Sequence, residues 1–166
     1  SEMVWKISKC QSAANGGVMR TSVVGLFPQA VALCAENICK LTHYDPRCVG
    51  SCVIVSELIH ALVYGRQIPS VPAILDMAKR FDPQISEYVM MAWQEEDVNR
   101  LMNDDCMGYT LLTLSVALWA FWHAESFEDG LLKVVNAGGD ADTNAATACA
   151  ILGAKFGYSA IPEEYV

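Results

Sequence analysis

The sequence predicts an all-α protein, a compact bundle of several helices. Apolar residues recur at helical spacing along most of the chain, and no segment shows strand-like alternation bounded by hairpin turns. No linker rich in Pro, Gly or Ser divides the 166 residues, so we expect a single domain. Hydrophobic residues make up 53% of the chain and charged residues 18%, against usual values of about 45–50% and about 25%. The bundle therefore has an unusually large apolar surface to bury.

The ends of several helices are marked by capping residues. Asp45 followed by Pro46, and Ser70 followed closely by Pro72, are typical of helix starts, because Asp and Ser cap the first turn and proline is tolerated there. Ser126 is followed by acidic residues that favour the N-terminal end of a helix dipole. In chain order, the helices are predicted over residues 23–39, 46–64, 70–80, 84–91, 94–102, 109–124, 127–136 and 142–157.

The helices differ in how much of their surface is apolar. The helix at 46–64 is apolar nearly all round, and the segment 111–122 is similar, so both are expected in the middle of the bundle. The helix at 142–157 carries many small residues, among them Gly153, which are expected to let neighbouring backbones approach closely. The segment 65–106 is more polar and has the weakest periodicity, which indicates a peripheral position.

Charge and hydropathy argue against two classes of partner. The net charge is −8 and no basic stripe exists, whereas nucleic-acid binding depends on Lys and Arg at the phosphates. No apolar run reaches the length of about 18 residues that a membrane span requires. We therefore expect no nucleic acid and no membrane as a partner. A diphosphate ligand remains compatible with the acidic balance if metal ions and backbone N–H groups meet its phosphates.

The cysteines indicate a reducing compartment. They are odd in number, they form no C-x-x-C pair, and the first residues do not resemble a signal peptide, so free thiols and a cytoplasmic location are expected. Cys48 and Cys52 lie four apart on a predicted helix, where buried thiols are a simpler interpretation than a zinc site. The seven cysteines are Cys10, Cys34, Cys39, Cys48, Cys52, Cys106 and Cys149.

The segment Gly138-Gly139-Asp140-Ala141-Asp142-Thr143 is the strongest candidate for chemistry. In a helix, residues two apart point about 200° from each other, so the two carboxylates converge only if the backbone there is not yet helical. The two glycines supply the freedom for such a backbone. Two carboxylates and a hydroxyl suit Mg²⁺ or Mn²⁺ better than Zn²⁺. The alternative is that one aspartate simply caps the following helix.

The segment 138–143 does not stand alone. Four segments and a short tail follow one another along the chain: CQSAANGGVMRTSVVGLF at 10–27, Leu-Thr-His at 41–43, Gly-Tyr-Thr at 108–110, NAGGDADTNAATACAILGAKFG at 136–157 and Ile-Pro at 161–162. In this order, over nearly the whole chain, they resemble the ADP-ribosylglycohydrolase family, which includes the dinitrogenase reductase-activating glycohydrolases. The Gly-Gly-Asp-Ala-Asp-Thr element and the upstream Asn-Gly-Gly-Val-Met-Arg are the specific part of the resemblance.

The resemblance implies an incomplete domain. Members of the family are all-α hydrolases about twice as long, within the size of one compact domain. Their N-terminal half carries a Thr-Asp-Asp element that supplies the other half of a two-metal site. The one Asp-Asp pair of this chain, Asp104-Asp105, follows Asn103 and lies in the wrong place for that element. Residues 1–166 are therefore expected to be the C-terminal part of a single ADP-ribosylglycohydrolase-like domain.

The resemblance also implies a set of site residues. Asp140 and Asp142 are the expected catalytic carboxylates, and with Thr143 they bind Mg²⁺ or Mn²⁺, two ions being present in the complete site. A structural interpretation stands beside each expected substrate contact: a turn of positive φ for the Asn-Gly-Gly segment, a solvated or satisfied side chain for the histidine, and a helix-start core residue for the tyrosine. The expected substrate-binding residues are Ser12, Asn15, Gly16, Gly17, His43 and Tyr109.

The resemblance implies two alternative functions. The first is a metal-dependent hydrolase that cleaves the glycosidic bond between ADP-ribose and a protein side chain or small-molecule acceptor, inactive as this chain alone. The second is a non-catalytic ADP-ribose-binding or assembly module with the same fold. As partners we expect an ADP-ribosylated protein or ADP-ribose derivative, and either the missing N-terminal half or another copy of the chain. Such a partner would cover apolar faces on the helices at 46–64 and 142–157.

Overall fold

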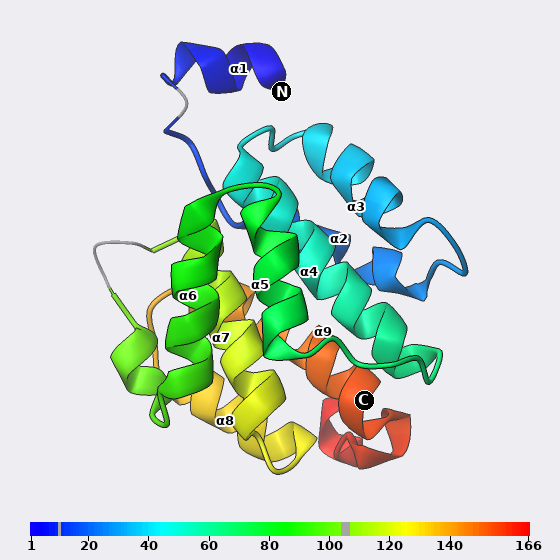
Figure 1. The fold of residues 1–166 in the computed structure, drawn as a ribbon. Helices are drawn as coiled ribbons and strands as arrows, with labels where there is room; N and C mark the ends of the chain where they lie inside the picture. The colour runs from blue at the N-terminus through cyan, green and yellow to red at the C-terminus, as the bar shows by residue number, and fades with distance from the viewer. Residues whose placement is uncertain (10, 104–106) are drawn as a thin grey trace.

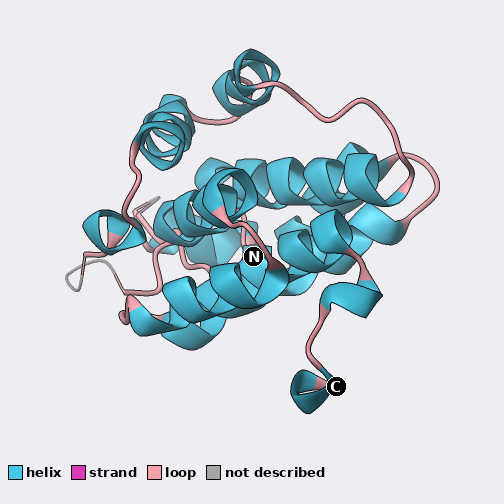
Figure 2. Ribbon diagram, turned by 90° about the horizontal axis from the view of Figure 1, so that it is seen from below, coloured by secondary structure: helices cyan, strands magenta, loops and turns pink. Residues whose placement is uncertain are grey.

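The prediction of an all-α fold is confirmed. The computed structural model describes residues 1–9, 11–103 and 107–166, and no strand occurs within them (Figure 2). Extended pairing there is limited to one isolated antiparallel bridge between Ala14 and Tyr109. The α-helices and the 3₁₀ helices, labelled η, are α1 (Glu2–Ile7), α2 (Gly16–Thr21), η1 (Ser22–Leu26), α3 (Val31–Lys40), α4 (Pro46–Val63), α5 (Val71–Lys79), α6 (Pro83–Gln94), η2 (Val98–Leu101), α7 (Thr110–His123), α8 (Phe127–Asn136), α9 (Ala141–Phe156), η4 (Tyr158–Ala160) and η5 (Glu163–Tyr165).

Helix α4 crosses the middle of the molecule, as its apolar surface predicts (Figure 1). It packs against α3, α5, α6, α7 and α9 as well as α2 and η1. Its backbone comes close to α6 at Gly50, where an added Cβ would lie 2.4 Å from Ile85 Cδ1. Helix α7 is buried along most of its length in the same core and packs against α6 and α9. These two helices form the frame on which the N-terminal ends of α2 and α9 are placed.

The caps predicted from the sequence form in part. The Asp45 carboxylate accepts a hydrogen bond of 2.9 Å from the Arg47 N–H at the start of α4, and the Ser126 hydroxyl accepts one of 3.0 Å from the Asp129 N–H at the start of α8. Ser70 occupies the N-cap position of α5, but its side chain makes no capping hydrogen bond. The corresponding cap of α6 comes from Asp82, which accepts from Gln84 N–H.

The predicted helix at 23–39 is wrong as a single element. The structure has η1 and then α3, with an irregular segment between them. Proline disfavours helical backbone in the residue before it, and Phe27, which precedes Pro28, is extended with φ −72° and ψ 139°. Ala30 then adopts a left-handed conformation with φ 54° before α3 begins.

Other boundaries also differ from the prediction. The segments 84–91 and 94–102 were expected to be two helices, and the structure instead extends α6 to Gln94 and follows it with the short η2. Glu95 is extended and ends α6. Helices α1 and α2 were not predicted as separate elements, because each has only six residues and therefore too few for a periodic pattern.

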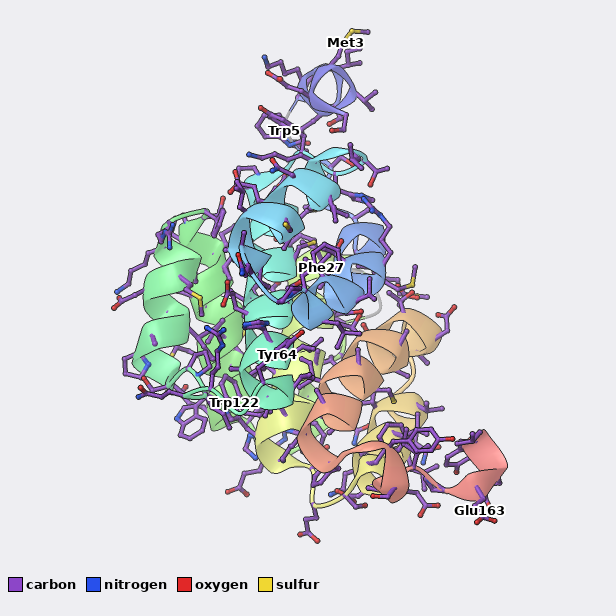
Figure 3. All side chains as sticks on the ribbon, turned by 90° about the vertical axis from the view of Figure 1, so that its right-hand side faces the viewer. Met3, Trp5, Phe27, Tyr64, Trp122 and Glu163 are labelled. Carbon is purple, nitrogen blue, oxygen red and sulfur yellow. The ribbon has the colours of Figure 1, made fainter. Side chains whose placement is uncertain are left out.

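Helix α1 stands apart from the bundle. None of its residues is buried, and it projects beyond α3 and α4 with Met3 at its outer side (Figures 1 and 3). Trp5 ties it to the rest of the molecule, since the indole Nε1 donates a hydrogen bond of 2.9 Å to Asp45 Oδ2. The Trp5 ring also packs at a tilt against Tyr44, with the ring centroids 5.8 Å apart.

The exposed apolar side chains lie elsewhere than expected. Helices α4 and α9 were predicted to present uncovered apolar faces, but α4 is buried on all sides and α9 packs against α7 and α8. Seven exposed large apolar residues lie on α1 and on the segment formed by α2 and η1, with Phe27 at its end (Figure 3), and others lie on α3, α6, α8 and the C-terminal segment. The seven are Met3, Val4, Ile7, Met19, Val23, Leu26 and Phe27.

Helix α4 also satisfies, by length and composition alone, the criteria for a helix that crosses a membrane. In the structure, 72% of that span is buried among the other helices, as in the core helix of a bundle. The same helix carries Cys48 and Cys52, both buried with free thiols, and burial raises the pKa of Cys48 to about 12. Cys34, Cys39 and Cys149 are free as well, while Cys10 and Cys106 lie outside the described residues.

Candidate functional site

The loop between α8 and α9 carries Asp140. Gly138 and Gly139 adopt positive φ values of 79° and 63°, which confirms that the two glycines supply backbone conformations that other residues rarely adopt. Helix α9 begins directly after Asp140, so this carboxylate precedes the helix as predicted. Asp142 already lies in the first helical turn. The expectation that both carboxylates sit on non-helical backbone is therefore correct for Asp140 and wrong for Asp142.

The Asp140 carboxylate does not cap α9 with a hydrogen bond. Asp140 occupies the N-cap position, yet its side chain makes no capping hydrogen bond to α9. Instead, Asp140 Oδ2 accepts a hydrogen bond of 2.6 Å from Asn15 Nδ2. The carboxylate therefore points across to the start of α2. Asp142 is exposed and Thr143 is buried.

Asn15, Gly16 and Gly17 form the turn that begins α2, but the positive φ suggested for this segment is wrong, because Asn15 has φ −83° and both glycines already belong to the helix. The turn is fixed to the start of α7 by two backbone hydrogen bonds of 2.9 Å: Asn15 N–H donates to the Gly108 carbonyl, and Thr110 N–H donates to the Ala13 carbonyl. The Asn15 side chain is 8% exposed and faces inward. Any contact of this turn with a ligand would therefore come from its backbone and its glycines.

His43 lies against the two glycines. A Cβ on Gly16 would come within 3.4 Å of the imidazole Cε1, and a Cβ on Gly17 within 3.3 Å of His43 Cγ and of Cys39 Sγ. Burial, and then the charge of Arg20, hold the pKa of His43 below its ordinary value. His43 Nδ1 is 2.8 Å from the Thr42 hydroxyl, and this hydroxyl accepts a hydrogen bond from Arg20.

Ser12 and His43 line the same small hollow, of about 90 Å³. Its other side is formed by α1, including Val4 and Trp5. Ser12 itself is exposed and makes no hydrogen bond among the described residues. The structure thus brings Ser12 next to His43, and the glycine turn joins this pair to Asn15 and Asp140.

Tyr109 lies half-buried beside Arg47. The Arg47 guanidinium donates a hydrogen bond of 3.3 Å to the Tyr109 hydroxyl and lies 5.7 Å from the ring centroid. Tyr88 meets the same ring edge-on at 5.8 Å. Burial raises the pKa of Tyr109, although Arg47 opposes this shift. These contacts hold Tyr109 at the start of α7, and its contact with a ligand stays a prediction.

Asp45 and Arg47 form an ion pair that the sequence did not single out. Arg47 Nη2 lies 2.8 Å from Asp45 Oδ2, and the Asp45 side chain is 1% exposed. Burial alone would raise the pKa of Asp45, but hydrogen bonds from Arg47 and Trp5 and the Arg47 charge together hold it below its ordinary value. Because Asp45 also caps α4, the pair fixes the start of this helix beside Tyr109.

Four helices begin at this end of the bundle, namely α2, α4, α7 and α9. Their starts are joined by the hydrogen bonds already described and by the Cys48 thiol, which lies 3.3 Å from the Ala14 carbonyl oxygen. The N-terminal end of a helix carries a partial positive charge and unpaired backbone N–H groups. This end of an otherwise acidic chain therefore offers a favourable local field for an anionic ligand.

Two residues of the site were missed in the sequence. The Thr113 hydroxyl accepts a hydrogen bond of 2.9 Å from Asn15 Nδ2 and donates one of 2.8 Å to Asn144 Oδ1. A signal existed for both, since Thr113 interrupts an apolar helix and Asn144 directly follows Thr143. Spacing along the chain gave no means of connecting them to Asn15.

The donors for a cation are few in the part of the chain that the structure describes. No group of three or more His, Cys, Asp or Glu side chains there is placed to hold a metal ion. What this end offers is the exposed Asp142 carboxylate, the Thr143 hydroxyl and Asp140 Oδ1, for which no hydrogen bond is found among the described residues. These are oxygen ligands of the type that Mg²⁺ and Mn²⁺ prefer, although they are too few to complete an octahedral site.

Two of the larger hollows lie between helices away from these residues. One, of about 440 Å³, is lined by η2, α7 and α8, including Glu96, Asp97 and Asp129. The other, of about 570 Å³, lies between the start of α3 and the end of α4 and includes Glu57 and His60. Neither contains a residue that the sequence predicts for the site, so size does not identify the functional end of the molecule.

Comparisons with known proteins agree with this assignment of the fold. The family model described as ADP-ribosylglycohydrolase matches residues 2–166. The ADP-ribosylarginine hydrolase Tri1 of Serratia proteamaculans (strain 568) is 26% identical over 94% of this chain and 42% of its own length, and Tri1 of Pseudomonas putida (strain GB-1) is 29% identical over 93% and 42%. A solved chain titled ADP-ribosylglycohydrolase-related protein complex superposes with a TM-score of 0.72 at 28% identity, over 92% of this chain and 53% of the other.

These relatives are longer than the chain. The chain spans about half the length of the curated relatives and of the solved structure that it matches, between 42% and 53% in these three comparisons. The match nevertheless runs from residue 2 to residue 166 without leaving out any part of the site. From its sequence and its fold, the chain belongs to the ADP-ribosylglycohydrolase family.

Proposed function

We propose that this chain forms part of a site that hydrolyses the glycosidic bond between ADP-ribose and an acceptor. One observation carries the proposal: a glycine turn, a half-buried histidine and a carboxylate from distant parts of the chain meet where four helices begin. A diphosphate needs backbone N–H groups, a ribose needs hydrogen-bond partners, and the scissile bond needs a carboxylate nearby. The residues at this end of the bundle supply each of these.

The glycine turn and His43 would bind the substrate. The small residues at the start of α2 leave room for close approach of phosphate groups to the backbone, and the helix dipole favours their negative charge. When the Thr42 hydroxyl donates to His43 Nδ1, the neutral imidazole keeps Nε2–H as a donor for a ribose hydroxyl or a phosphate oxygen. Burial, and then the charge of Arg20, lower the pKa of His43 and so favour this neutral form.

Asp140, Asp142 and Thr143 would hold Mg²⁺ or Mn²⁺. When bound, such ions act as Lewis acids that orient the distal ribose and a water molecule and stabilise developing charge. The donor set fits these ions in kind, since it consists of two carboxylates and a hydroxyl. Three protein ligands are few for a site of two octahedral ions, so other ligands would complete it. We therefore expect this chain alone to bind substrate or metal weakly and not to turn substrate over.

The acceptor is proposed from the relatives. Two of them are named ADP-ribosylarginine hydrolase, so an arginine side chain is the first acceptor to test. The partners proposed for the chain are an ADP-ribosylated protein or ADP-ribose derivative, and a second polypeptide that completes the site. This polypeptide would be an N-terminal half of the family domain or another copy of the chain. A cytoplasmic location, in keeping with the free thiols, and the absence of nucleic-acid and membrane partners stay predictions.

A non-catalytic module that binds ADP-ribose is the second candidate. It is favoured by the lack of a group of three metal-binding side chains among the described residues. Hydrolysis of an ADP-ribosylated arginine peptide separates the two candidates. Under the first, turnover appears when the chain is combined with a polypeptide that completes the site, and it requires Mg²⁺ or Mn²⁺. Under the second, the combined proteins bind ADP-ribose and release no product.

The metal assignment is tested with a double substitution. Asp140→Ala with Asp142→Ala, in the chain combined with a polypeptide that completes the site, should abolish Mn²⁺ binding measured by isothermal titration, with helix content nearly unchanged, since neither change removes a side-chain cap of α9. The control is Asp76→Ala with Glu87→Ala, which removes the same charge from exposed positions on α5 and α6. Unaltered Mn²⁺ binding in the first variant, or equal loss in both, would rule out the proposed ligands.

A further inference from the structure

A closed ring of hydrogen bonds includes one oxygen of the Asp140 carboxylate and the Asp140 backbone carbonyl. Asn15 Nδ2 donates to Asp140 Oδ2 at 2.6 Å and to Thr113 Oγ1 at 2.9 Å, which uses both of its amide hydrogens. The Thr113 hydroxyl passes its own hydrogen to Asn144 Oδ1 at 2.8 Å. Asn144 N–H then returns to the Asp140 backbone carbonyl at 2.9 Å, at the start of α9. The ring thereby links the start of α2 to the start of α9 through Thr113, in the first turn of α7.

The ring is fixed because it is buried. The exposed fractions are 8% for Asn15, 1% for Thr113 and 0% for Asn144. Each hydrogen bond has a defined direction, since Thr113 can donate only one hydrogen and Asn15 has two to give. A buried polar group without its partner is costly, so the ring members hold one another in place. The Thr113 hydroxyl in the apolar helix α7 accepts one of these hydrogen bonds and donates another, which the methyl group of valine could not do.

We propose that Thr113 and Asn144 are positioning residues that act through Asn15 to fix the orientation of the Asp140 carboxylate. This inference rests on the proposed function of Asp140 and extends it to residues that touch neither substrate nor ion. With Oδ2 held by Asn15, the carboxylate presents Oδ1, for which the described residues provide no hydrogen-bond partner. The Asn15 side chain then holds the Asp140 carboxylate and does not contact the substrate directly.

The structure leaves one further donor beside the ring. Asn144 Nδ2 is buried and has no hydrogen-bond partner among the described residues. The orientation of its amide is set by the other end, since Asn144 Oδ1 accepts from Thr113. Replacing the Thr113 hydroxyl by a methyl group would leave Asn15 Nδ2 with one hydrogen bond, to Asp140. It would also remove the hydrogen bond that fixes the Asn144 amide, which could then rotate. The substitution that tests the ring is thus Thr113→Val, which keeps the shape of the side chain.

The experiment measures the side-chain rotamer of Asp140 without any ion present. Three-bond couplings from the backbone nitrogen and carbonyl carbon to Asp140 Cγ should show one fixed rotamer in the unaltered chain and an average of rotamers in Thr113→Val. Thr113→Ser keeps the hydroxyl and should restore the fixed rotamer. The matched control is Thr147→Val, another buried helical threonine, whose hydroxyl donates to the Thr143 carbonyl at 3.1 Å and lies outside the ring.

A titration with Mn²⁺ forms the second arm. Thr113→Val should weaken Mn²⁺ binding by about 10-fold or more, as loss of a partner of a ligand usually does, while Thr113→Ser and Thr147→Val stay near the unaltered affinity. A fixed Asp140 rotamer in Thr113→Val would overturn the proposal, as would equal averaging in Thr147→Val. If the Asp140 rotamer were averaged in Thr113→Val but the Mn²⁺ affinity did not change, the proposed effect of the ring on ion binding would be wrong. If the unaltered chain bound no Mn²⁺, the metal proposal would fail, and the couplings would still decide whether the ring positions Asp140.

Discussion

At the scale of single residues, His43 shows how packing sets chemistry. The imidazole is half-buried against the glycine turn, and this burial lowers its pKa because the charged form loses solvation. The charge of Arg20 lowers the pKa further. Arg20 also donates to the Thr42 hydroxyl and, at 3.0 Å, to the Ile38 carbonyl, so its position is fixed. The pKa of His43 therefore depends on how Arg20, at the end of α2, is held against the end of α3.

Arg20→Gln should raise the pKa of His43, because a positive charge no longer opposes protonation. In the unaltered chain, the pKa of His43 is lower in the folded state than in the unfolded state. As the pH falls below about 6.5, the unfolded state therefore binds more protons than the folded state, and the free energy of unfolding decreases. The variant should show a smaller fall in this window. The imidazole Cε1–H signal followed by NMR against pH measures the shift. Lys40→Gln removes an equal charge that does not act on His43, so an equal response in both variants would contradict the account.

The same scale shows what a sequence can and cannot reveal about a site. The types and positions of Asp140 and Asn15 are readable as candidates, because glycines and oxygen ligands cluster around each. Their hydrogen bond is not, since it joins positions 125 residues apart and depends on how α2 and α9 dock. Thr113 was overlooked because its place in an apolar helix marks it as polar but does not indicate that its partners are Asn15 and Asn144.

At the scale of elements, glycines decide how closely helices approach. Gly25 in η1 faces α4, where an added Cβ would lie 2.7 Å from Ile59 Cβ and 2.8 Å from the Ser56 carbonyl oxygen. Gly153 in α9 was expected to allow a similar approach, and this expectation is wrong, because a Cβ there meets nothing within 4 Å. A small residue in a helix thus predicts close packing only where a neighbouring element faces it.

The two glycines should respond in opposite directions to alanine. Gly25→Ala should lower the free energy of unfolding by about 1–3 kcal/mol, because backbone and a branched side chain must both shift. Gly153→Ala should raise it by about 0.5–1 kcal/mol, because alanine loses less conformational freedom in a helix. Urea denaturation of both variants measures the changes. Destabilisation by Gly153→Ala would mean that α9 packs more tightly at this position than the structure shows.

At the scale of the whole molecule, one series of exposed apolar side chains lies beside the candidate site. Met19 is 41% exposed, Val23 57% and Leu26 51%, and all three belong to α2 and η1. These elements follow directly after the glycine turn of the candidate site. The relatives matched by the chain are about twice as long. An apolar surface beside a site that lacks ligands is what a second polypeptide would cover.

We therefore expect the chain to associate in solution. Light scattering coupled to size exclusion should show a mass above 18.1 kDa, from contact through the α2 and η1 surface. Val23→Glu with Leu26→Glu should reduce the association, because it places two charges on that surface, and Leu132→Glu with Val135→Glu on the exposed face of α8 should not. A stable, monodisperse monomer of the unaltered chain would contradict this expectation.

The overall architecture was more predictable than its details. Helical periodicity and the apolar surface of the segment 46–64 are local signals, and they correctly predicted an all-α bundle with this helix at its centre. The break at Pro28 and the uncovered faces depend on which elements pack together, and local signals carry little of that information. The central claim, that the end where α2, α4, α7 and α9 begin is the ligand site, depends on the same packing.

Paramagnetic broadening by Mn²⁺ tests this claim most directly. Added below stoichiometric amounts, the ion quenches NMR signals of nearby amides and so marks its own position on the chain. The account predicts that the amides of Asn15 and Asp140 broaden first, and that ADP-ribose added afterwards shifts the signals of Gly16 and His43. Broadening centred on the acidic hollow lined by Glu96 and Asp129, with Asn15 and Asp140 unaffected, would contradict it.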